Sequence, residues 1–147
     1  MKATDLRIGN WIKYEDKFVQ VVQVSSLMIL CQRDENQFLV NCAPKVFEPI
    51  KLTEEVLTNI GFKKVCEKNN APFNVNKFKF NNDINDNEFV NISYVLFESG
   101  NSIINMEHGD YYSGIDDNHI YKLNVKYLHQ LQNIYYLLTD EELEVNL

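Results

Sequence analysis

The residues best suited to bind a metal lie together near the end of the chain. Two imidazoles, His108 and His119, flank three carboxylates, Asp110, Asp116 and Asp117. These side chains are ligands that Zn²⁺ or Mn²⁺ accepts. The segment has neither the helical His pair of HExxH nor the alternating acidic residues of an EF-hand loop. We therefore expect a surface loop with no metal or other cofactor, and keep His108, Asp110, Asp116 and His119 as weak metal candidates.

Motifs for nucleophilic catalysis or phosphate binding are missing from the sequence. It contains no GxSxG elbow, P-loop or GxGxxG, and its five glycines leave little material for a phosphate-binding loop. A Ser or Cys triad assembles in space, so the absence of a motif does not exclude one. The sequence predicts a protein without enzymatic activity.

The segment 125–138 has the strongest helical pattern, and Asn124 is its expected N-cap. The predicted core side consists of Tyr127, Leu128, Leu131, Ile134, Tyr135 and Leu138. The other side carries His129, Gln132, Asn133 and Tyr136, which we expect to be exposed and to bind a partner. The alternative is that another segment covers this side and that His129 and Gln132 bond to loop carbonyls.

Length, charge and cysteines limit the class of protein. At 147 residues and 45% hydrophobic, the chain can form one globular domain, and it has no apolar run of membrane-spanning or signal-peptide length. Residues 1–80 hold 12 basic and 9 acidic residues, whereas residues 81–147 hold 2 and 12. Cys31, Cys42 and Cys66 lie in apolar stretches without CxxC spacing, which predicts buried free thiols in a cytosolic protein.

The first third of the chain predicts a β-rich sub-unit. Short apolar strands at 11–14, 18–24, 27–31 and 38–42 follow Gly9, which favours a small bent barrel of the SH3-like kind over residues 1–48. The run 27–31 is apolar throughout, as expected for a strand buried on both faces. The expected core residues are Trp11, Val19, Val22, Leu30 and Leu39.

Residues 49–147 predict an antiparallel sheet with two helices. Thr53 and Gly61 are the expected ends of a short helix. Strands follow at 63–67, 75–80, 88–98, 102–107 and 120–123, with 88–98 in the centre and a loop at 109–118. With the final helix, the chain is expected to be a single compact α+β domain over residues 1–147.

Three segments carry a family resemblance: DLRIGNW at 5–11, EPIKLTEE at 48–55 before Gly61-Phe62, and VKYLHQLQNIYY at 125–136 with TDEEL at 139–143. In this order they resemble a family of small uncharacterised proteins of Bacteroides-type bacteria and their phages or prophages. Residues 63–118 match nothing in that family. The resemblance implies a cytoplasmic protein of bacterial or phage origin. It supplies no catalytic residue, because the family has no known activity.

These observations favour a non-enzymatic, phage- or prophage-associated interaction module that binds a protein partner or self-associates. The first alternative is a nucleic-acid-related role, either a weak backbone binder that uses the slightly basic first half or an acidic DNA mimic that uses the second half. The second alternative is a small metal-dependent enzyme that uses the segment 108–119.

Overall fold

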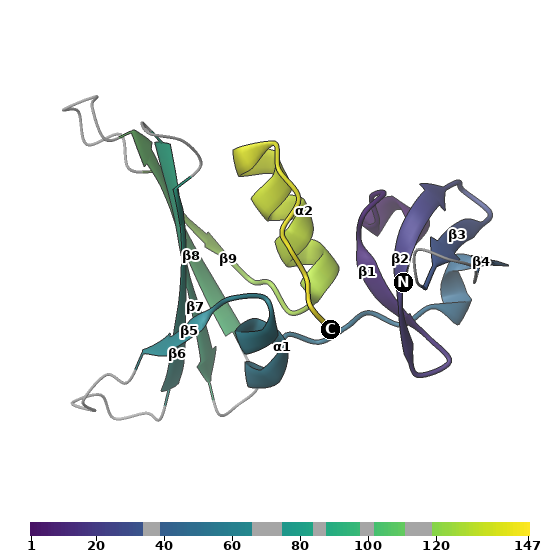
Figure 1. The fold of residues 1–147 in the computed structure, drawn as a ribbon, viewed down its shortest axis with the longest axis horizontal. Helices are drawn as coiled ribbons and strands as arrows, with labels where there is room; N and C mark the ends of the chain where they lie inside the picture. Colours follow the sequence, from purple (N-terminus) through teal and green to yellow (C-terminus); the bar gives the residue numbers. More distant parts are fainter. Residues whose placement is uncertain (34–38, 66–74, 84–87, 98–101, 111–118) are drawn as a thin grey trace. The chain divides into compact units, whose positions relative to one another are not determined.

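The computed structural model describes residues 1–33, 39–65, 75–83, 88–97, 102–110 and 119–147 (Figure 1). The α+β chain divides into two compact units. The first comprises Met1–Leu52, Tyr127–Leu143 and Leu147, and the second comprises Thr53–Lys126 and Glu144–Asn146. The C-terminal helix thus belongs to the same unit as the first sheet, whereas the sequence predicts it in the sub-unit of the second sheet. None of the described helices is long and apolar enough to cross a membrane.

The first sheet consists of four antiparallel strands in sequence order: β1 (Trp11–Tyr14), β2 (Lys17–Val24), β3 (Ile29–Gln32) and β4 (Leu39–Cys42). All four lie close to their predicted positions. The turn between β1 and β2 contains Glu15 and Asp16 with φ of 46° and 61°. Two successive left-handed residues match the twist of an antiparallel hairpin, so this turn sets the pairing of Tyr14 with Lys17.

After β4 the chain returns to β1. The short 3₁₀ helix η2 (Pro44–Val46) reverses its direction. Lys13 N then donates to the Glu48 carbonyl at 2.8 Å, and Glu48 N donates to the Lys13 carbonyl at 2.9 Å. Among the described strands no ladder joins β1 to β4, so no closed barrel is formed in this part of the chain.

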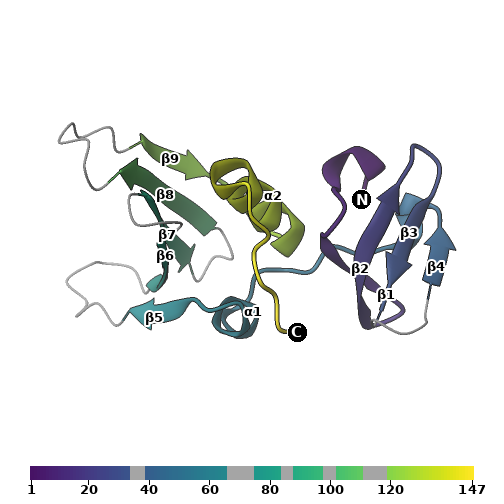
Figure 2. The same ribbon diagram turned by 45° about the horizontal axis from the view of Figure 1, so that its top comes forward.

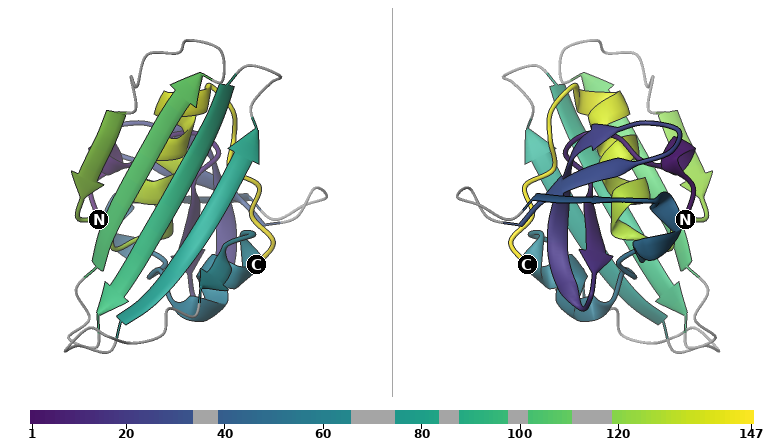
Figure 3. Two further views of the ribbon diagram at one scale, coloured as in Figure 1. Left: turned by 90° about the vertical axis from the view of Figure 1, so that its left-hand side faces the viewer. Right: turned by 90° about the vertical axis from the view of Figure 1, so that its right-hand side faces the viewer.

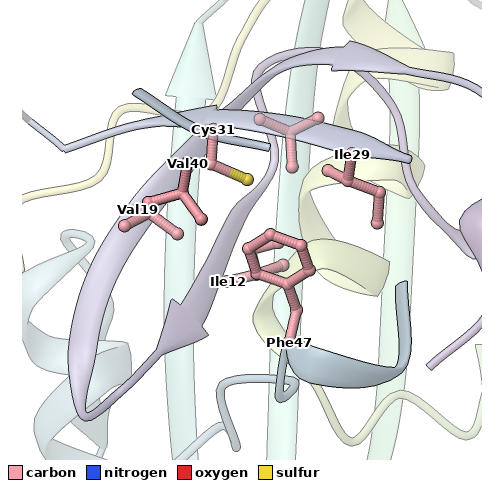
Figure 4. Close-up of a cluster of buried hydrophobic side chains, with 7 residues drawn as sticks. Ile12, Val19, Ile29, Cys31, Val40 and Phe47 are labelled. Carbon is pink, nitrogen blue, oxygen red and sulfur yellow. The ribbon is translucent and has the colours of Figure 1, made fainter. Parts of the chain in front are cut away.

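One face of the first sheet holds the core of the first unit, with the side chains of Ile12, Val19, Val21, Ile29, Cys31, Val40 and Phe47 in one cluster (Figure 4). Burial of Val19 confirms its prediction. Trp11, Val22 and Leu30 are half-buried and lie at the edge of this core, and the burial of Leu39 is outside what the structure describes. The neighbours Ile12 and Val21 take the inner face, and the register shifts between Val21 and Gln23. A shift of one residue exchanges the two faces of a strand.

The predicted strand 27–31 is also wrong at its start. Leu27 is 76% exposed, and β3 begins only at Ile29. Ser25 closes the turn instead, because its Oγ donates to the Met28 carbonyl at 2.8 Å and accepts from Met28 N at 2.9 Å. This local side-chain bonding outcompetes extension of the strand.

The short helix α1 (Glu54–Asn59) has the predicted ends. Thr53 Oγ1 accepts from Val56 N at 3.3 Å, which confirms the N-cap. Gly61 has φ of 92°, and Phe62 N donates to the Leu57 carbonyl at 2.9 Å. The left-handed glycine lets the chain fold back on the last turn. Phe62 then stacks on Phe80 of the second sheet, with ring centroids 5.2 Å apart.

The second sheet is antiparallel and five-stranded, in the order β5 (Lys63–Val65), β6 (Val75–Asp83), β7 (Glu88–Phe97), β8 (Ser102–Asp110) and β9 (His119–Leu123) (Figure 2). The central position of β7 is confirmed. One face buries Phe78, Ile92, Tyr94 and Ile104, and the Tyr94 hydroxyl donates to the Val125 carbonyl at 3.1 Å. The predicted loop at 109–118 starts late, because β8 continues to Asp110.

Cys31 is expected to resist a bulky thiol reagent until the chain unfolds. Its side chain is fully buried, and burial raises the pKa of this thiol to about 12. The reactive species is the thiolate, so native labelling will be slow at Cys31 and faster at the half-buried Cys42. The folded pKa lies above the ordinary 9.0, so stability is lost as the pH rises above that value.

Mass spectrometry of the labelled protein, native and unfolded, checks the expected reactivity, with Cys31→Ala as the control. Rapid labelling of native Cys31 would contradict it. Cys66 lies outside the described residues.

Candidate functional site

The predicted binding residues lie on α2 (Leu128–Thr139), whose N-cap is Tyr127 and not Asn124. Two contacts define this start. Leu128 N donates to the Ile50 carbonyl at 2.9 Å, and Tyr127 N donates to Gln130 Oε1 at 3.2 Å. A carbonyl from a distant segment therefore binds the first free amide of the helix, which explains why the capping residue Asn124 is not used.

The two sides of α2 differ in part from expectation. Leu128, Leu131 and Tyr135 are buried, as predicted for the core side, whereas Tyr127, Ile134 and Leu138 are half-buried. On the other side His129 is only 3% exposed and Gln132 only 1%. The prediction that this side is exposed is therefore wrong for these two residues, whereas Asn133 and Tyr136 are half-buried. The reason is that residues 5–11, which we name the leader, contact this side of the helix.

Gln132 uses both of its amide atoms within the first unit. Its Oε1 accepts from Trp11 N at 2.9 Å, and its Nε2 donates to the Gly9 carbonyl at 3.3 Å. The side chain thus bonds to the main chain at the start of β1, as the alternative interpretation of this face expected. A partner could bind the Gln132 amide only by breaking these bonds.

Asn133 belongs to a chain of amide hydrogen bonds. Arg7 N donates to Asn10 Oδ1 at 2.9 Å, and Asn10 Nδ2 donates to Asn133 Oδ1 at 2.8 Å. Asn133 Nδ2 in turn donates to the Asp5 carbonyl at 3.2 Å. Asn10 is fully buried, so these bonds satisfy an amide that would otherwise be costly to bury.

Tyr136 lies under the side chain of Arg7. The guanidinium carbon is 4.1 Å from the centre of the ring, a cation–π arrangement. Arg7 also forms a two-pronged ion pair with Glu142, in which Nη2 lies 2.9 Å from Oε2 and Nη1 contacts Oε1. The hydrogen bond to Glu142 raises the pKa of Arg7, and a hydrogen bond to Asp140 raises the pKa of Tyr136.

His129 is a buried imidazole. Its ring is stacked on Tyr127, with centroids 5.9 Å apart and planes 9° apart, and Nδ1 has no hydrogen-bond partner among the described residues. Burial lowers the pKa of His129, and the nearby Asp5 carboxylate opposes this effect. The imidazole is therefore neutral at pH 7, which suits a packed side chain.

Three residues at this contact were not singled out in the sequence: Arg7, Asn10 and Glu142. These three residues lie in the segments 5–11 and 139–143, which the sequence sets apart, but nothing in it gives any of them a role. Gly9 also lies at the contact between the leader and the Glu142 side chain, where there is little room for a Cβ atom. It has φ of 91°, and a Cβ there would lie 3.1 Å from the Glu142 carboxylate oxygens.

The metal candidates lie elsewhere in the chain. His108 and Asp110 belong to β8 and His119 to β9, and the register places His108 directly opposite His119. Asp116 lies outside the described residues. In the part of the chain that the structure describes, no three His, Cys, Asp or Glu residues form a metal-binding group.

The contacts on α2 join the helix, the leader and the C-terminal segment of the first unit. They consist of amide hydrogen bonds, one ion pair and one cation–π contact, and they place no nucleophile beside a base. These contacts hold the leader and the C-terminal segment in place on α2. The chain matches no protein-family model, and comparison with the curated proteins and with the solved structures found no match.

Proposed function

We propose that this protein is a non-enzymatic interaction module that binds a protein partner or a second copy of itself through the first unit. The binding surface is the exposed part of the contact between the leader and α2. The resemblance of residues 5–11, 48–55 and 125–143 supports a phage or prophage origin and a location in the bacterial cytoplasm.

Two exposed aliphatic side chains carry the proposal. Ile8 is 59% exposed and Leu137 is 81% exposed. Ile8 follows Arg7 in the chain and Leu137 follows Tyr136, and Arg7 and Tyr136 are in contact. Large apolar side chains gain free energy when a partner covers them. Tyr and Arg are also the residues most enriched where binding energy concentrates.

The contacts beneath this surface support the same role. Hydrogen bonds of Asn10, Gln132 and Asn133 fix the leader on the helix, so a partner meets a surface that is already ordered. Binding to an ordered surface avoids the entropy cost of fixing side chains and loops. His129 and Gln132 then act as supports, and the half-buried Asn133 and Tyr136 are the members of the predicted set that a partner can reach.

We also propose that residues 1–48 form a small bent barrel of the SH3-like kind that stays open between β1 and β4. The order of four strands, a 3₁₀ helix and a return to β1 supports this assignment. Two main-chain hydrogen bonds between Lys13 and Glu48 bring the segment after η2 back to β1. A small barrel of this kind leaves its surface free for binding while its interior is filled by side chains.

The double variant Ile8→Ser, Leu137→Ser is expected to fold normally and to lose association. Both side chains are exposed, so the melting temperature will stay close to that of the unchanged protein. Sedimentation velocity over a wide concentration range measures self-association. Affinity purification from the host, with both proteins as bait, measures a partner that the unchanged protein retains and the variant loses.

Leu27→Ser is the matched control, because Leu27 is 76% exposed in the same unit but lies in the turn before β3. It should leave association unchanged. If Leu27→Ser abolishes association and the double variant does not, the binding surface lies elsewhere on the first unit. If both proteins associate like the unchanged chain, the proposal is wrong.

A further inference from the structure

The outer face of the second sheet, opposite the face that buries Phe78 and Tyr94, carries a continuous polar row. The register pairs Lys63 with Lys79, Lys79 with Ser93, Ser93 with Asn105, and Asn105 with Lys122. This row crosses all five strands. Figure 3 (left) shows β6 to β9 face on, and no described helix of the second unit crosses this face.

Lys63 and Lys79 are exposed and directly opposite each other. Two like charges at such a position destabilise a sheet. In the described part of the chain neither lysine has an ion pair. Lys64, one residue further, contrasts with them because its Nζ binds Glu54 Oε1 at 2.7 Å and Oε2 at 2.9 Å. Within the described residues, Lys64 therefore has a carboxylate partner, whereas Lys63 and Lys79 have none.

Other groups of this face can also form hydrogen bonds. Ser93 is half-buried on β7, Asn105 is half-buried on β8, and Asn81 is exposed on β6. Amide and hydroxyl groups beside lysines are the groups that contact phosphate and sugar oxygens in nucleic-acid complexes.

We propose that the outer face of the second sheet binds single-stranded nucleic acid through its phosphates. The exposed Lys63 and Lys79 favour an anionic ligand, although the register also places Glu107 on this face opposite Asn91. A row across five strands needs an anion that is extended. Strands about 4.8 Å apart make the row about 19 Å long. The major groove of a duplex is only about 12 Å wide, so this face cannot enter it. A single strand can lie across a sheet and follow the row.

The sequence predicts that a nucleic-acid backbone would contact the basic first half of the chain, whereas the lysines proposed here lie on the second sheet. Lys63 and Lys79 belong to the basic residues 1–80, but they lie on the second sheet and not on the first. The net charge of −7 opposes binding at long range, so affinity will be modest and will fall steeply with salt. This site is independent of the surface proposed on the first unit.

The test is fluorescence anisotropy of the full chain with a labelled oligothymidylate and a labelled oligouridylate at low salt. Lys63→Gln, Lys79→Gln is expected to weaken binding by about tenfold, and to make the slope of log K against log salt shallower by about 1.4. Ser93→Glu, which places a carboxylate in the middle of the row, is expected to weaken binding similarly. Circular dichroism checks that each variant is folded.

The matched control is Lys17→Gln, Lys45→Gln, which removes the same charge from exposed positions of the first unit. It should change affinity by less than about twofold. Four results would overturn the proposal: no binding by the unchanged protein, equal weakening by both double variants, tighter binding to a duplex than to the single strand, or equal competition by polyglutamate of the same charge. The last would assign the face to an acidic protein segment.

Discussion

Gln132→Leu is expected to lower the free energy of unfolding by about 2 to 4 kcal/mol. Leucine fills nearly the same volume but leaves Trp11 N without an acceptor and removes one of the two side-chain donors of the Gly9 carbonyl, which keeps the bond from Gln20 Nε2. A buried backbone group that loses its partner costs about 1 to 3 kcal/mol. Urea denaturation of the full chain measures the change.

Leu137→Ala is the control on the same helix, because its side chain is exposed, and it should change stability by no more than about 0.5 kcal/mol. Gln132→Glu adds a test of the polar contact. A buried carboxylate beside the Gly9 carbonyl would have a raised pKa, so this variant should be most stable at low pH and lose stability as the pH rises. If Gln132→Leu unfolds like the unchanged protein, the amide is free to serve a partner.

Phe47→Ala is expected to destabilise the first unit by about 3 to 5 kcal/mol. The ring is fully surrounded where the chain leaves η2, and it packs in the cluster that contains Ile12 and Ile29 (Figure 4). The ring centroids of Phe47 and Tyr14 are 5.6 Å apart, and the two ring planes are tilted by 48°. Loss of the ring leaves a cavity that the two hairpins cannot close, because their register is fixed by backbone bonds.

Calorimetry measures this effect, and Val46→Ala provides the control one residue earlier. Val46 is exposed, so its truncation should leave the melting temperature nearly unchanged. Equal melting of Phe47→Ala and the unchanged protein would show that the return of the chain to β1 contributes little to the first unit.

Local chemistry explains why much of the fold was predictable. The ends of α1 follow from Thr53 and Gly61, and the first hairpin follows from Glu15 and Asp16, because caps and tight turns depend on a few neighbouring residues. Alternating apolar residues identified every strand of the second sheet. In the first sheet alternation left open which of two neighbours faces inward: Ile12 and Val21 lie in the core, and the register shift next to Val22 breaks the alternation in β2.

The start of α2 shows a second kind of failure. Asn124 has the right chemistry for an N-cap, but the helix begins at Leu128 because the Ile50 carbonyl binds its first amide. A capping preference is worth about 1 kcal/mol, and a contact from a distant segment can outweigh it. Nothing near Asn124 in the sequence reports that Ile50 will lie beside the helix.

The sequence by itself determined that α2 has an apolar side and a polar side, and that residues 63–67, 75–80 and 120–123 form strands of one antiparallel sheet. Only the tertiary structure decided what those sides meet. A polar side chain records a capacity for hydrogen bonds, and water or another segment can satisfy it equally well. For Gln132 the partner is main chain 121 residues away, at Trp11. The lysines of the outer face join in one row only because the register of five strands aligns them, and that register depends on long-range pairing.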